Sequence, residues 1–144
     1  MLYRLPESNM PQSMQDALIQ LMVVTAHSDT ILSPLELRAI TGLAARLPVF
    51  DGYDASRIPG MANACADLVN GPAGIDGALD RIVAAIPQRL HDTAYALAVE
   101  IAVVDLELPQ EQLRLLEMLR DRLSTDRLVT AAIETSARAR MRKG

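Results

Sequence analysis

Long apolar runs, paired cysteines and aromatic side chains are all scarce in this chain of 144 residues. A membrane-spanning helix needs roughly 20 apolar residues in a row. The most apolar stretches, residues 17–26 and 93–106, are shorter, and Glu100 and Asp105 interrupt the second. Cys65 is the single cysteine, which excludes an internal disulfide. Because a secretory signal pattern is also missing from the N-terminus, we expect a cytoplasmic protein without a membrane span.

The charge is modest and unevenly distributed. The net charge is −4, which argues against general nucleic-acid binding. Residues 1–126 carry nine arginines against seventeen acidic residues, whereas residues 127–144 carry five basic residues against Glu134. Basic side chains in the last turn of a helix complement its dipole and stay solvated. The alternative for the basic C-terminal segment is an anionic partner or membrane surface.

The composition predicts an all-α fold. Half of the residues are apolar, but only 3% are aromatic, and the apolar residues are mainly Leu, Ala, Ile, Val and Met. Abundant alanine and leucine favour helices, whereas strands favour β-branched and aromatic residues. The length is that of one domain, residues 1–144. We expect a bundle of about seven helices after a loose N-terminal arm over residues 1–10.

Helix boundaries follow from apolar periodicity, capping residues and prolines. The best start signal is Ser33-Pro34-Leu35-Glu36, which has the residues of a capping box with proline at the first helical position. The helix that it opens is expected to end before Pro48 and to bury Leu37, Ile40, Leu43, Ala44 and Leu47. The other helices are expected near residues 12–27, 54–69, 75–86, 87–105, 109–123 and 127–137.

The two halves of the chain match at a shift of 76 residues. The matching pairs are Asp29 with Asp105, Leu32 with Leu108, Leu37 with Leu113, Ile40 with Leu116, Leu43 with Leu119 and Leu47 with Leu123. A helical hairpin cannot bury its own apolar face, so two copies provide a shared core. We therefore predict two pseudo-symmetric helical-hairpin repeats, residues 12–50 and 88–126.

Acidic residues stand at the turn of each repeat. Asp29 and Asp105 each lie where a helix is expected to end, facing the negative end of its dipole. Backbone N–H groups of the turn could compensate this charge. A hard divalent cation, Ca²⁺ or Mg²⁺, could also do so if several oxygens converge. The candidate metal ligands are Asp29, Glu36, Asp105 and Glu111, although the capping box by itself also accounts for Glu36.

The same two turns resemble the motif of the tellurite-resistance TerB family. The matching segments are Asp29-Thr-Ile-Leu-Ser-Pro-Leu-Glu36 and Asp105-Leu-Glu-Leu-Pro-Gln-Glu-Gln112. This resemblance implies a seven-helix fold, an acidic patch for divalent metal, and a role in bacterial tellurite and stress responses. It also implies protein partners, some membrane-associated, rather than catalysis. The chain departs from the motif at Thr30 and Leu106, which replace glycines, and at Gln112, which replaces the usual glutamate.

Other polar residues allow simpler interpretations. Glu100 lies in an apolar helix and is expected to reach solvent or to pair with an arginine, such as Arg89 or Arg120. His27 and His91 lie near expected helix ends and are interpreted as solvated imidazoles, too few for a zinc cluster. Cys65 is interpreted as a packing residue.

The leading functional hypothesis is a TerB-like, non-enzymatic binding or adaptor module that responds to a divalent cation. Two alternatives stay open at this point: a metal-dependent enzyme that uses the acidic turns, and a purely structural oligomerisation domain.

Overall fold

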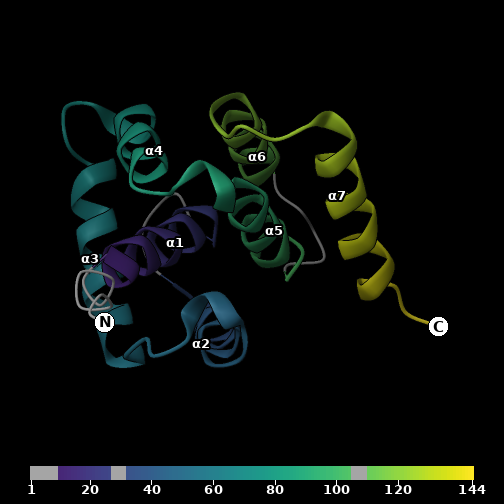
Figure 1. Cartoon of the computed structure of the whole chain (residues 1–144), viewed down its shortest axis with the longest axis horizontal. Coiled ribbons are helices and arrows are strands. Elements are labelled where there is room, and N and C mark those ends of the chain that lie inside the picture. The colour runs from purple at the N-terminus through teal and green to yellow at the C-terminus, as the bar shows by residue number, and fades with distance from the viewer. Residues whose placement is uncertain (1–9, 27–31, 105–109) are drawn as a thin grey trace, which may run out of the picture.

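A computed structural model describes residues 10–26, 32–104 and 110–144 of the chain (Figure 1). Within these ranges the chain has seven α-helices and no strand, which confirms the prediction of an all-α bundle. None of these helices is long and apolar enough to cross a membrane. The helices are α1 (Met10–Ala26), α2 (Pro34–Arg46), α3 (Ile58–Val69), α4 (Gly74–Ala84), α5 (His91–Ala102), α6 (Gln110–Arg122) and α7 (Arg127–Met141). Among the described residues, three 3-10 helices connect these helices: η2 (Pro48–Phe50), η3 (Ala55–Arg57) and η4 (Gln88–Leu90).

Several helix ends differ from the sequence prediction by a few residues. Helix α1 already includes Met10, which was assigned to the loose arm; residues 1–9 of that arm lie outside the described residues. Pro87 has an extended backbone and opens η4, so α5 begins only at His91. Helix α5 ends at Ala102, before the predicted end near Asp105.

The predicted capping box at the start of α2 is confirmed. The backbone N–H of Glu36 donates to Ser33 Oγ over 3.1 Å, and the backbone N–H of Ser33 donates to Glu36 Oε1 over 3.0 Å. The prediction that Leu37 is buried was wrong, because its side chain is 38% exposed. The buried stripe of α2 consists of Ile40, Leu43 and Ala44.

Helices α1 and α5 form the centre of the bundle and contact each other. Both are apolar on nearly all sides, and such a helix is stable only when other elements surround it. In α1 the residues from Leu18 to Ala26 are buried except Gln20, and in α5 Tyr95 is completely buried.

The other helices surround this pair in two matching sets. Helix α1 contacts α2 and α3, and in the same way α5 contacts α6 and α7. In addition, α1 contacts α6 and α5 contacts α2. The ends of the matching helices keep the 76-residue shift: Ala26 with Ala102, Pro34 with Gln110, and Arg46 with Arg122. We call residues 10–69 the first unit and residues 91–141 the second unit. Whether the interhelical angles also match stays a prediction.

Helix α4 breaks this correspondence. It packs on α1, α3 and α6, burying Ala78, Leu79 and Ile82. The matching place would be on α5, α7 and α2, and no helix within the described residues packs on all three. In Figure 1, α4 lies at upper left, whereas no labelled helix lies at lower right between α2 and α7. The first unit is therefore covered on a face that no described helix covers in the second.

Candidate functional site

The structure describes only two of the four predicted metal ligands, and these two have different surroundings. Asp29 and Asp105 lie outside the described residues. Glu36 uses Oε1 in the capping box, so this oxygen is engaged in holding the start of α2. Glu111 is exposed in the first turn of α6 and has no such bond among the described residues. The structure therefore describes two of the four acids and gives Glu36 a structural role.

Gln112, the residue beside Glu111, makes a contact that the sequence analysis did not predict. It is buried, and its Nε2 donates to the carbonyls of Thr25 and Ala26 over 3.1 and 3.0 Å. These carbonyls belong to the last turn of α1, where backbone acceptors have no partner within the helix. Gln112 thus ties the start of α6 in the second unit to the end of α1, the central helix of the first unit.

The sequence contains a reason for this difference between Gln112 and Glu36. The two residues are 76 positions apart, and Ser33 corresponds to Pro109 at the same shift. Proline has no backbone N–H, so Pro109 has no N–H to offer Gln112, whereas Ser33 donates to Glu36. An amide, unlike a carboxylate, can also donate to the carbonyls of α1. A glutamine at this position, rather than a glutamate, therefore has a structural explanation.

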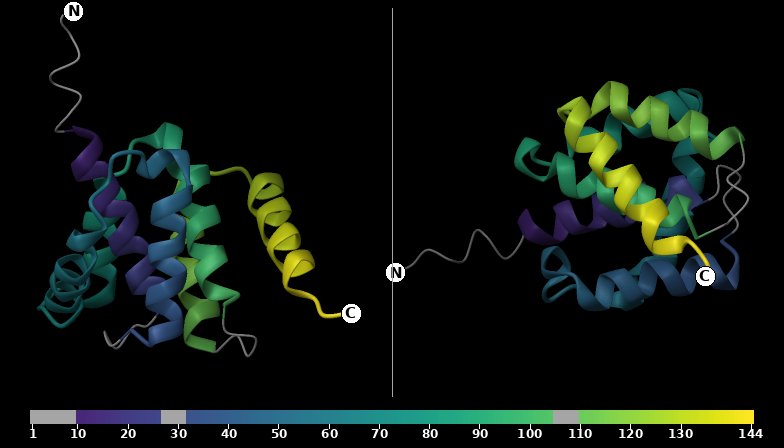
Figure 2. Two further views of the ribbon diagram at one scale, coloured as in Figure 1. Left: turned by 90° about the horizontal axis from the view of Figure 1, so that it is seen from below. Right: turned by 90° about the vertical axis from the view of Figure 1, so that its right-hand side faces the viewer.

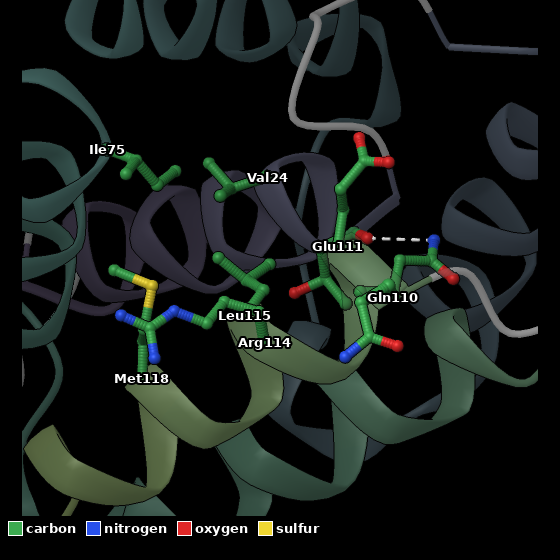
Figure 3. Close-up of a pocket in the computed structure, with 9 residues that line it drawn as sticks. Val24, Ile75, Gln110, Glu111, Arg114, Leu115 and Met118 are labelled. Atoms are coloured by element: carbon green, nitrogen blue, oxygen red, sulfur yellow. Dashed lines mark hydrogen bonds between the residues drawn. The ribbon is translucent and has the colours of Figure 1, made fainter.

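A pocket of about 400 Å³ lies beside Gln112, between α1, α4 and α6 (Figure 3). Figure 3 shows Gln110 and Glu111 at one end of the pocket and Ile75 and Met118 at the other. The lining is mostly apolar and also includes Val24, Thr25, Gln112, Arg114 and Leu115. The Oε1 of Gln112 is buried and has no hydrogen-bond partner among the described residues. One buried amide oxygen and one exposed carboxylate thus adjoin an apolar pocket.

Two ion pairs fix α4 as the wall of this pocket. Arg122 of α6 binds Asp76 and Asp80 of α4, with both N–O distances at 2.7 Å. Hydrogen bonding to Asp80 is the largest influence on Arg122 and raises the pKa of its guanidinium. Asp76 and Asp80 are one helical turn apart and therefore reach the same arginine.

A second polar cluster lies where α5, α6 and α7 meet. Tyr95 donates its hydroxyl hydrogen to Glu134, and Arg120 donates to both groups, over 2.8 Å to Tyr95 and 3.0 Å to Glu134. Burial, followed by the hydrogen bond to Glu134, raises the pKa of Tyr95 to about 12. The tyrosine is therefore a protonated hydrogen-bond donor near neutral pH. This cluster borders a groove of about 380 Å³.

Two interpretations from the sequence change here. Glu100 pairs with Arg140 of α7, and neither Arg89 nor Arg120 is its partner. His91 is buried rather than solvated: its Nδ1 accepts the Ser124 N–H over 2.8 Å, and Nε2 lies 3.0 Å from the Ile86 carbonyl. A sequence pattern could not reveal either contact, because each partner is brought there by a different helix or loop.

Cys65 fits the predicted role of a packing residue. Its thiol is buried, donates to the Gln20 carbonyl over 3.3 Å, and has its pKa raised by burial to about 12. A thiol with such a pKa is a poor nucleophile at neutral pH.

Within the described residues, no group of three or more His, Cys, Asp or Glu side chains could hold a metal ion. Asp29 and Asp105 lie outside that part of the chain, so the predicted four-residue set stays a prediction. Comparisons with protein-family models, curated proteins and solved structures give no match to this chain.

Proposed function

We propose that this protein is a TerB-like helical binding module that belongs to a bacterial stress or tellurite-resistance system. In this proposal it acts in the cytoplasm by holding a protein partner and does not catalyse a reaction. A divalent cation, Ca²⁺ or Mg²⁺, binds at the acidic end of the bundle and stabilises it.

The contact between Gln112 and the end of α1 carries this proposal. It joins the start of α6 to the last turn of α1. In the sequence, Asp29 comes three residues after the end of α1, and Asp105 comes five residues before the start of α6. Glu111 and Gln112 both line the adjoining pocket, and the Oε1 of Gln112 has no hydrogen-bond partner among the described residues. Hard cations prefer carboxylate and amide oxygens, so these residues fit Ca²⁺ or Mg²⁺ better than a softer metal.

A cation titration tests the proposal. Thermal unfolding is followed with Ca²⁺, Mg²⁺, Mn²⁺ and Zn²⁺, each up to several millimolar, the weakest range for dedicated Ca²⁺ sites. At a hundredfold excess over the dissociation constant, a cation that binds only the folded state adds about 2.7 kcal/mol. We expect Ca²⁺ or Mg²⁺ to raise the melting temperature of the native chain, and the rise to shrink in Asp29→Asn and Glu111→Gln.

Asp67→Asn is the matched control, because Asp67 is an exposed acid on α3, away from the turns. An equal shift in the control and in Glu111→Gln would show general screening rather than a site. No shift with any cation would remove the cation from the proposal. Sedimentation of the same samples separates the oligomerisation alternative, which requires a stable dimer without added cation.

A further inference from the structure

The open face of the second unit has the features of a docking seat for a helix. We propose that this face, formed by α5 and α7 beside the end of α2, binds an acidic amphipathic helix of the partner protein. This inference rests on the proposed binding function and specifies the chemistry of the partner. We call the surface the α5–α7 seat and define it by Ala96, Ile133, Ala137, Arg140 and Arg46.

The first argument is the correspondence between α3 and α7. Buried residues lie seven positions apart in both helices, Ile58 and Cys65 in α3 and Thr130 and Ala137 in α7, a shift of 72 residues. In the first unit, Gln20 of α1 contacts Met61 and Cys65 of α3.

At the 76-residue and 72-residue shifts, those three residues correspond to Ala96, Ile133 and Ala137. These three line an open groove of about 320 Å³ between α5 and α7. Helix α4 packs across α1 and α3 in the first unit, and no helix in the described part of the chain packs across α5 and α7 in this way. The groove therefore corresponds to the surface that α4 covers.

The second argument concerns charge. Arg122 holds α4 through Asp76 and Asp80, and its counterpart at the 76-residue shift is Arg46, in the last turn of α2. Arg46 is exposed, and no described side chain forms an ion pair with it.

The two arginines also fold back in the same way. The Nη1 of Arg122 donates to the carbonyl of Met118 four residues earlier, and the Nη1 of Arg46 lies 3.3 Å from where a Cβ of Gly42 would be. An occupant that repeats the contacts of α4 must bring two carboxylates one helical turn apart to Arg46. The positive charge of residues 127–144 acts in the same direction.

The third argument concerns reversibility. It explains why the occupant is a separate partner that can leave the groove, which water then covers. Glu100 and Arg140 form an ion pair at the groove, and their side chains are 35% and 54% exposed. At the two shifts they correspond to Val24 and Leu68 in the covered unit. Charged groups at the edge of an apolar groove keep an empty surface soluble and suit a partner that binds reversibly.

Binding of a helical peptide tests the α5–α7 seat. The probe is a fluorescein-labelled peptide with the sequence of residues 71–86, held helical by a hydrocarbon staple between the exposed positions 81 and 85. A staple is needed because such short helices are marginal in water. Fluorescence anisotropy with the full chain measures the dissociation constant. We expect saturable binding, and about tenfold weaker binding when the peptide carries Asp76→Asn and Asp80→Asn.

Two protein variants locate this interaction. Arg46→Glu should weaken binding about tenfold or more, because it places a like charge opposite the two acids. Arg81→Glu is the matched control, since Arg81 is also an exposed arginine in the last turn of a helix, but on α4. It should leave binding unchanged. Thermal melting of both variants verifies that they fold, and a photo-crosslinker on the peptide should label α5 and α7.

Several results would overturn the inference. One is the absence of saturable binding up to about 1 mM peptide. Another is equal binding of the peptide to Arg46→Glu and Arg81→Glu. A third is crosslinking to α1 and α3, which would show that the peptide replaces the chain's own α4. If the protein self-associates and Arg46→Glu abolishes this self-association, the face binds a second copy of the chain instead. Binding of anionic vesicles that depends on Arg46, without peptide binding, would assign it to a lipid surface. Since the cation titration does not involve Arg46, a cation shift without peptide binding rejects the seat and keeps the proposed module.

Discussion

The first and second units share a three-helix frame but differ in what covers it. In both, an apolar central helix contacts a second helix with the same 76-residue spacing and a third with buried residues seven apart. Helix α4 covers the first unit and is held by Arg122 from the second, whereas the α5–α7 groove is open to solvent. One copy of a repeated fold can thus be covered by a helix of the same chain while no described helix covers the matching face of the other copy. Figure 2 shows α7 at the edge of the bundle.

The largest expected difference between the units concerns their matched leucines. Leu119 is completely buried in α6, which contacts α4, whereas Leu43 in α2 is 6% exposed. Replacing a buried leucine with alanine costs about 2–5 kcal/mol, and more where the cavity cannot collapse. We expect Leu119→Ala to lower the free energy of unfolding more than Leu43→Ala, as measured by urea denaturation. A larger loss at Leu43 would contradict the assignment of α4 as the cover of one unit only.

The next comparison is between Gln112 and Glu36, which occupy matching positions. Gln112→Ala leaves two buried carbonyls of α1 without their side-chain donor, at a cost of about 1–3 kcal/mol. Glu36→Ala removes one bond of an exposed capping box and should cost less, about 0.5–1 kcal/mol. Equal losses in chemical denaturation would show that the link between α6 and α1 adds no stability.

The capping box gives a smaller effect that is confined to the first unit. Ser33→Ala removes the side-chain acceptor for the Glu36 N–H and should cost about 1 kcal/mol. Ser124→Ala is the control, because only the backbone N–H of Ser124 takes part in the bond to His91. The expected result is a lower denaturation midpoint for Ser33→Ala alone. An unchanged midpoint for that variant would mean that water replaces the serine oxygen.

The smallest expected effect is a loss of stability of the first unit near pH 9, caused by ionisation of Cys65. Burial raises the pKa of Cys65 from 9.0 to about 12, so the folded state favours the neutral thiol. The stabilising contribution is complete below pH 9 and is lost as the pH rises toward about 12. At about pH 9 the loss is only about 0.4 kcal/mol, which Cys65→Ala should remove from the pH profile of stability. A thiol that reacts with labelling reagents in the folded protein at neutral pH would contradict this burial.

Much of the local structure could be predicted from the sequence because it depends on neighbours in the chain. The Ser33 capping box and the 76-residue spacing of the helix ends involve only short-range rules for turns, prolines and apolar periodicity. Leu37 was misplaced because periodicity identifies a face of a helix, whereas the neighbouring helices determine how much of that face is covered.

The candidate site depends on contacts between distant segments, and the sequence predicted only a part of it. The acidic turns were found as a pattern, but the bond of Gln112 to the end of α1 joins residues 87 positions apart. Glu100 does pair with an arginine, but its partner is Arg140 of α7, 40 positions away, and not Arg89 or Arg120. No local rule ranks one distant arginine above another.

The sequence by itself determined the class of fold, the helix starts and the repeat, since helix propensity, capping and apolar spacing are properties of adjacent residues. Only the tertiary structure decided that α4 covers one unit and leaves the α5–α7 seat open. That choice depends on ion pairs and side-chain packing between helices, such as Arg122 with Asp76 and Asp80, which form only when the whole chain has folded.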